Sequence, residues 1–325
     1  DWALTSGFKK GITSVKSMGA GLINAAADTF GNEELDKYSL VRKYLLNESD
    51  GFVKKPILWV HNTYNINARS WESYYSRNTN NINQPYIYLC IESIIKYCGK
   101  SFNVCIIDDD SFGKLLKNWT ININELADPI KENVRNLALA NLLHEYGGMV
   151  IPNTTVVLKD IIDLYNSKTK SNDMFVGEFV NRNITSAYSR FFPSHKFMGC
   201  KKESKAMKEY IDYLEITISR DNTNASQIEG TLDKFLYSLV KQNKCDLICG
   251  KSIGVKNKDD EVILMDDWLQ ESHINVCLCS LYCICLPGLE MLKRVKYGWF
   301  LRSNKQQLLE SNANISKYLI IALGK

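Results

Sequence analysis

Polar side chains follow three short apolar runs in the first half of the chain, and their types suit ligand chemistry. In chain order the three groups are His61 and Asn62; Asp108, Asp109 and Asp110; and Pro152, Asn153 and Thr154. If the runs are neighbouring parallel strands, their carboxyl ends meet at one edge of a sheet, where open α/β sheets bind ligands. Imidazole and amide atoms suit the edge of a nucleotide, and carboxylates suit Mg²⁺ or Mn²⁺.

Each of these groups also has a purely structural explanation. Asp110 can cap a helix that follows it, with Asp108 and Asp109 simply hydrated. His61 and Asn62 can equally be ordinary polar residues at the start of a loop. Both interpretations of the aspartates and of the His-Asn pair remain open on sequence grounds.

The segment 129–146 predicts an amphipathic helix that leads into the third apolar run. Apolar residues recur there at three- and four-residue spacing, namely at Ile130, Val134, Leu137, Ala138, Leu142 and Tyr146. Gly147 and Gly148 come next, where a left-handed residue ends a helix at little cost. The residues 149–151 then form an apolar run of the kind found in buried strands.

This block carries a family resemblance. Tyr146-Gly147-Gly148, the apolar run and a downstream Val157-Leu158-Lys159 resemble the capsular-polysaccharide-synthesis glycosyltransferases and the related family whose sugar-binding region contains a DXD motif. Less specific similarity extends over roughly residues 54 to 245. The resemblance implies an α/β fold of the nucleotide-sugar transferase A-type, a mostly parallel Rossmann-like sheet with helices on both faces. It implies three segments: an N-terminal helical extension (1–50), the transferase-like domain (51–245) and a C-terminal elaboration packed on the same domain (246–325).

The charged residues that the resemblance implies are missing here. Counted from the glycines, the family's helical Asp falls on Asn136, its Arg on Leu139 and its first metal-binding Asp on Pro152. Asn and Thr oxygens offset little of the charge of a metal-bound diphosphate. The resemblance therefore implies a degenerate nucleotide-sugar pocket, formed by His61, Asn62, Asn136, Asn153 and Thr154. Asp108, Asp109 and Asp110 remain as candidate metal ligands.

Two functions compete on this basis. In the first, the domain is catalytically degenerate, needs no cofactor and serves as a structural or assembly module, for example as a minor component of a large virus capsid. In the second, it is an active transferase that uses Mn²⁺ or Mg²⁺ to move a hexose from a nucleotide diphosphate sugar to a glycan. The missing carboxylates favour the first, because neutralising a metal-held leaving group supplies several kcal/mol of transition-state stabilisation. The frequent Asn, Ile and Lys are typical of AT-rich genomes such as those of many large DNA viruses.

Composition narrows the setting. The 325 residues are 45% hydrophobic, enough for a large α/β core, and the net charge of +4 is dispersed along the chain, so we expect no nucleic-acid partner. No apolar run has the roughly 18 residues that a membrane span needs, so we expect no transmembrane segment. Because the chain begins at Asp1 rather than Met, we expect that a segment precedes it. An intracellular, virion-associated location is our expectation.

The two flanks are the predicted partner surfaces. Residues 8–30 show helical spacing of small apolar residues, which can pack on this domain, on another protein or at a membrane interface. Residues 293–302 combine basic residues with Tyr297, Trp299 and Phe300. This second segment can stack on an acceptor sugar, form a protein interface or close the sheet as a C-terminal lid.

The chain has ten cysteines and no Cys-x-x-Cys pair. Cys277, Cys279, Cys283 and Cys285 form two Cys-x-Cys pairs, and in a strand the members of each pair share one face. We expect buried thiols in a reduced, intracellular protein. A metal or disulfide cluster is the alternative.

Overall fold

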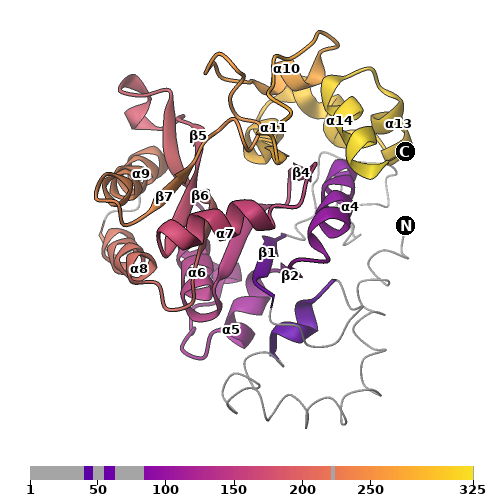
Figure 1. Ribbon diagram of the computed structural model, residues 1–325. Helices are drawn as coiled ribbons and strands as arrows, with labels where there is room; N and C mark the ends of the chain where they lie inside the picture. The colour runs from indigo at the N-terminus through magenta and orange to yellow at the C-terminus, as the bar shows by residue number, and fades with distance from the viewer. Residues whose placement is uncertain (1–39, 47–54, 63–83, 221–223, 325) are drawn as a thin grey trace, which may run out of the picture.

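The computed structural model describes residues 40–46, 55–62, 84–220 and 224–324, and a six-stranded sheet lies at the centre of this part of the chain (Figure 1). In the order β2-β1-β3-β6-β5-β7 its strands are β2 (Asn103–Ile107), β1 (Ile57–His61), β3 (Gly148–Pro152), β6 (Phe191–Cys200), β5 (Met174–Val180) and β7 (Asp246–Ile248). β6 is antiparallel to both neighbours, whereas the other five share one direction. The predicted mostly parallel α/β sheet is confirmed.

Helices cover both faces of this sheet (Figure 1). One face carries α6 (Ile130–Tyr146), α8 (Lys205–Ile218) and α9 (Ala225–Lys241), and the other carries α4 (Pro85–Cys98) and α7 (Ile162–Ser171). Trp59 and Val150 point to the first face, and Leu58 and Met149 to the second. Because alternate side chains are buried on both faces, the strands read as continuous apolar runs rather than alternating patterns.

The C-terminal part of the chain packs against α4. It contains α10 (Met265–Leu269), α11 (Gly288–Lys293), α12 (Gly298–Arg302), α13 (Lys305–Glu310) and α14 (Asn314–Leu323), and its β8 (Cys283–Cys285) pairs with β4 (Thr155–Val157) in a second, two-stranded sheet. β4 therefore lies outside the central sheet. Residues 246–248 also supply the edge strand β7, so this part of the chain contributes to both sheets.

Two helices differ from what the sequence suggests. The helix that Asp110 could cap is only a 3-10 turn, η4 (Asp109–Ser111), followed by the single turn α5 (Phe112–Leu115). It ends early because Leu116 is extended and the chain then turns back towards α6. The helix α7 was not predicted, because its sequence, IDLYNSKTKS, is mostly polar and buries only Leu164 and Thr169.

The glycine pair between α6 and β3 is required by the fold. Gly147 and Gly148 have φ angles of 72° and 95°, as their predicted left-handed conformation demands. A Cβ on Gly148 would lie 2.1 Å from the carbonyl oxygen of Ile57 on the neighbouring β1. Trp59 Nε1 donates to the Gly147 carbonyl at 3.2 Å. The tight turn thus brings β3 directly beside β1.

The structure separates the residues of the predicted C-terminal interface. Tyr297 and Phe300 are buried, and Phe300 packs against Tyr86 of α4 with ring centroids 5.2 Å apart. These two rings close the domain as a lid, so the prediction that they contact a partner is wrong for them. Trp299 is 44% exposed and remains available at the surface. The other predicted partner segment, 8–30, lies outside the described residues.

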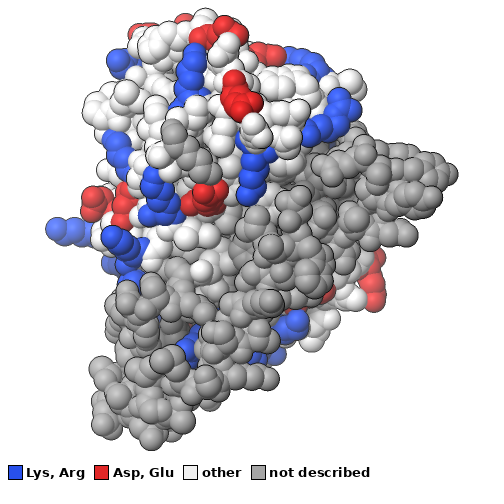
Figure 2. Space-filling model, turned by 90° about the vertical axis from the view of Figure 1, so that its right-hand side faces the viewer, with Lys and Arg blue, Asp and Glu red and all other residues white. Residues whose placement is uncertain are grey.

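The described surface mixes charges of both signs. On the face in Figure 2, Lys and Arg side chains lie among Asp and Glu side chains over the described part. Among the described residues of the whole surface, several charged side chains form ion pairs, such as Lys296 with Asp266 at 2.7 Å. Of the described helices, none has the length and apolar character to cross a membrane.

Candidate functional site

The carboxyl ends of β1, β2 and β3 are level, and they form the candidate site. His61 pairs with Ile107 on one side and with Pro152 on the other. The chain leaves β1 for β2 and then returns across β1 to form β3. This reversal of strand order is the switch point at which open α/β sheets bind ligands. The polar groups that follow these three strands therefore begin at one edge of the sheet.

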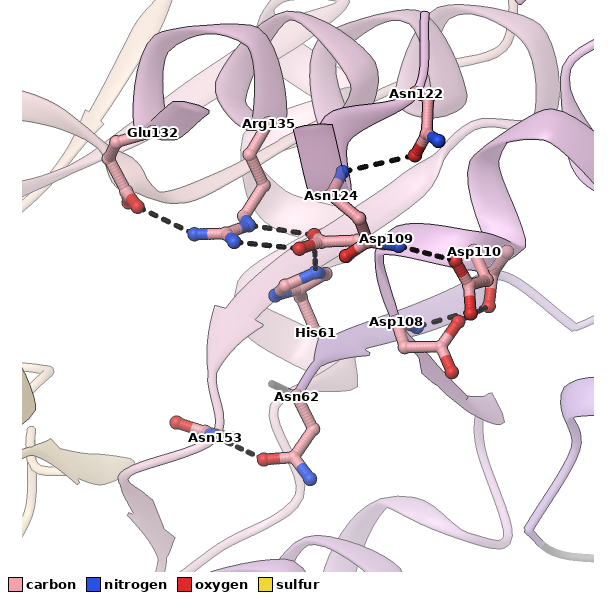
Figure 3. A network of polar contacts seen from close by, with 11 residues as sticks. His61, Asn62, Asp108, Asp109, Asp110, Asn122, Asn124, Glu132, Arg135 and Asn153 are labelled. Atoms are coloured by element: carbon pink, nitrogen blue, oxygen red, sulfur yellow. Dashed lines mark hydrogen bonds and ion pairs between the residues drawn. The ribbon is translucent and has the colours of Figure 1, made fainter. Parts of the chain in front are cut away.

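Asp109 is the centre of a charged network at this edge, which we call the Asp109 network: His61, Asp109, Glu132 and Arg135 (Figure 3). Arg135 Nε and Nη2 each donate to one carboxylate oxygen of Asp109 at 2.8 Å. His61 Nε2 lies 2.9 Å from Asp109 Oδ1, and Arg135 Nη1 donates to Glu132 at 2.7 Å. The bidentate contact is the strongest geometry available to an Arg-carboxylate pair.

The network keeps Asp109 ionised. Burial raises the pKa of the Asp109 carboxyl, but hydrogen bonds and charge from Arg135 and His61 outweigh it and hold the pKa well below its usual range. An ionised carboxylate only accepts hydrogen bonds, so His61 donates through Nε2. The His61 ring also stacks on Phe112 at 5.7 Å between centroids. The negative charge of Asp109 is therefore balanced by Arg135 and by the hydrogen bond from His61.

Asn62 and Asn153 meet beside this network. Asn153 Nδ2 donates to Asn62 Oδ1 at 2.7 Å, which joins the ends of β1 and β3 (Figure 3). Asn62 is only 2% exposed. Thr154 instead donates to the carbonyl of Leu286 at 2.8 Å and so fastens the C-terminal segment to β4. Of the predicted pocket residues, the structure brings His61, Asn62 and Asn153 together.

The two helical positions of the predicted pocket have other surroundings. Asn136 is buried and donates to the hydroxyl of Tyr210 on α8 at 2.9 Å. Leu139 packs against the apolar core on the same face of the sheet. The side chain of α6 that does reach the strand ends is Arg135, the residue next to Asn136.

The three aspartates do not offer a common ligand set for a divalent cation. Asp108 accepts from Ser111 at the start of η4, and Asp110 accepts from Asn124 at 2.7 Å. Asp109 gives both oxygens to Arg135. In the ranges that the structure describes, no group of three or more His, Cys, Asp or Glu side chains could hold a metal ion. The donor set present does not fit Mg²⁺ or Mn²⁺, which require several free oxygens.

A second polar cluster lies near the start of the reversed strand β6. Asp233 of α9 is 5% exposed, and its Oδ2 accepts from Asn183 at 2.7 Å. Burial and the nearby Glu229 raise the pKa of Asp233 to about 7. Burial lowers the pKa of His195 to about 4, against the opposing charges of Glu229 and Glu132.

Sequence reasoning missed this cluster and also missed Arg135 and Glu132. The three-residue spacing of Glu132 and Arg135 on a predicted helix was a usable signal for an ion pair. Nothing in the sequence marks β6 as reversed, and that reversal is what places the start of the strand at the carboxyl edge of β3.

Comparison with known proteins adds only weak structural similarity. No protein-family profile and no curated protein matches the chain. The crystal structure of the glycosyltransferase GlyE from Streptococcus pneumoniae TIGR4 matches with a TM-score of 0.32 and 10% identity, over 61% of this chain and 46% of its own. The PaToxG glycosyltransferase matches with a TM-score of 0.32 and 14% identity, over 68% and 78% respectively. This chain thus spans less than half of GlyE, and similarities of this size assign neither family nor activity.

Proposed function

We propose that this chain is a glycosyltransferase-like α/β domain that has lost metal-dependent catalysis and serves as a structural or assembly module. The observation that carries the proposal is the bidentate contact of Arg135 with Asp109, together with the neutral Asn62–Asn153 contact beside it. The one carboxylate at the centre of the edge is already matched by a protein cation. An active transferase of the resembling families would need uncompensated carboxylates there.

Two positions at which the resembled families have Asp support the same conclusion. Pro152 at the end of β3 has no side-chain oxygen, and Asn136 is turned towards Tyr210. Removing the metal's contribution to leaving-group neutralisation costs several kcal/mol of transition-state stabilisation. We further propose that residues 8–30 and the exposed side of 293–302, including Trp299, are the surfaces that contact other proteins.

The test is a calorimetric and thermal-shift panel of nucleotide diphosphate sugars, each with and without Mn²⁺ or Mg²⁺, followed by a donor-hydrolysis assay. A ligand at one hundred times its Kd adds about 2.7 kcal/mol of stability. We expect no metal-dependent stabilisation and no hydrolysis. Stabilisation by one donor that requires the metal, with turnover, would overturn the proposal and support a hexosyltransferase.

A carboxylate-restoring variant separates a disarmed pocket from a remodelled one. The pair Asn136→Asp and Pro152→Asp places acidic groups at the positions that the resemblance implies. We expect no recovered turnover, because Asn136 faces α8 and Arg135 occupies the centre of the edge. Recovered turnover would mean that the pocket is intact and only its carboxylates were lost. The assembly role is tested separately, since a soluble monomer without particle association in its native source would contradict it.

A further inference from the structure

The two Cys-x-Cys pairs have opposite surroundings. Cys283 and Cys285 lie in β8 and are buried, as predicted. Cys277 and Cys279 lie on a turn, and the prediction of a buried strand is wrong for them. Cys279 is exposed, Cys277 is half-buried and their sulfur atoms are 2.7 Å apart. The two sulfur atoms are therefore close enough to be joined without moving the backbone.

The protein holds this turn in place from three sides. Val276 and Leu281 flank it and are buried in the C-terminal core. The Leu281 N–H donates to the Cys277 carbonyl at 3.0 Å. Lys159 Nζ donates to the carbonyls of Leu278 and Cys279 at 2.7 and 2.8 Å. Because both ends and the carbonyls are fixed, the two thiols are kept close together without a covalent link.

The surroundings also activate Cys277. Hydrogen bonds from Cys279 and from the hydroxyl and N–H of Ser280 lower the pKa of the Cys277 thiol to about 6. Its thiolate is therefore the main form at neutral pH, and the thiolate is the reactive nucleophile. Burial does the opposite for Cys98, whose pKa is raised to about 12. Because of this contrast, oxidation should occur at the exposed Cys277–Cys279 pair in preference to the buried thiols.

We propose that Cys277 and Cys279 are a redox site that forms a reversible intramolecular disulfide by exchange with low-molecular-weight disulfides. The Cys277 thiolate attacks one sulfur of the small disulfide, whose S–S bond breaks and releases one thiol. The Cys279 thiolate then attacks the Cys277 sulfur and expels the second thiol. The two protein thiols lose two electrons and two protons in total, and the small disulfide gains both.

The experiment treats the full-length reduced chain with oxidised glutathione and blocks the remaining thiols by alkylation under denaturing conditions. Mass spectrometry of the intact chain and of its peptides then locates any link. We expect loss of two hydrogens and a bond between Cys277 and Cys279. The control Cys249→Ser removes the other exposed thiol and leaves this result unchanged. Cys279→Ser stops the reaction at a stable glutathione adduct on Cys277.

A kinetic measurement gives an independent readout. The alkylation rate of Cys277 should rise with pH around a midpoint near 6, and Cys279→Ala should move that midpoint upward because it removes a hydrogen-bond donor. Three results would overturn the proposal: both thiols still free after oxidised glutathione, a link from either thiol to Cys249 or to a second chain, or equal alkylation rates for Cys277 and Cys249 at pH 7. Capture of a soft metal ion by the pair in place of oxidation would also refute it.

Discussion

Removing the positive partner of Asp109 should expose how much the Asp109 network contributes to stability. The Arg135 and Asp109 side chains are only 12% and 10% exposed, so the pair is largely shielded from water. Arg135→Met keeps the aliphatic volume and leaves the carboxylate with His61 alone. Breaking a buried pair in this way costs about 3–5 kcal/mol. Because His61 remains and the site lies at the sheet edge, we expect a loss of about 2–3 kcal/mol at pH 7.

The pKa of Asp109 determines how the stability difference between the wild type and Arg135→Met changes with pH. In the wild type the lowered pKa of Asp109 contributes stability that is present above its unfolded value of about 4 and is lost as pH falls further. Without Arg135, burial dominates and raises that pKa, so the variant is penalised at neutral pH and relieved when Asp109 becomes protonated. The difference between the two proteins should therefore shrink between pH 5 and pH 3.

Urea unfolding followed by far-UV circular dichroism at several pH values measures both effects. Adding Asp109→Asn to Arg135→Met should restore most of the loss, because no unpaired charge is then buried. Glu132→Gln is the matched control, since the Glu132 side chain is 50% exposed and its ion pair is worth less than about 1 kcal/mol. A pH-independent loss below about 0.5 kcal/mol for Arg135→Met would refute the reasoning.

Three further predictions concern other parts of the fold. Burial raises the pKa of Asp233 to about 7, so the ionised carboxylate destabilises the folded protein increasingly as pH rises from 4 to 7. Asp233→Asn should therefore stabilise the protein by up to about 4 kcal/mol at pH 8 and by much less at pH 4, as measured by urea unfolding. Gly148→Ala should cost at least about 3 kcal/mol or prevent folding, whereas Gly113→Ala, with no atom within 4 Å of the added Cβ, should cost less than about 1 kcal/mol. Phe300→Ala should lower stability by about 3–5 kcal/mol and Trp299→Ala by less than about 1 kcal/mol, and similar losses for both would contradict the lid assignment.

The sequence alone determined most of the sheet and its helices. The runs at 57–60, 104–107 and 149–151 are apolar because both faces of these strands are buried, and such runs are recognisable without a structure. The Gly147-Gly148 pair marked the turn between α6 and β3 because only glycine tolerates that conformation beside another backbone. The polar residues after each run then predicted a common edge.

Tertiary structure alone decided what those polar residues do. Arg135 and Asp109 are 26 residues apart and Asn62 and Asn153 are 91 apart, so their contacts depend on how the strands and α6 are placed in space. Neighbouring residues of an α-helix point about 100° apart, so the orientation of α6 about its own axis decides that Arg135 reaches the strand ends while Asn136 faces α8. The same holds for Cys277 and Cys279, because pairing with β4 ends at Cys283 and leaves the first Cys-x-Cys pair on an exposed turn. Local sequence specifies which residues are buried or turn-forming, whereas distant contacts specify the chemistry.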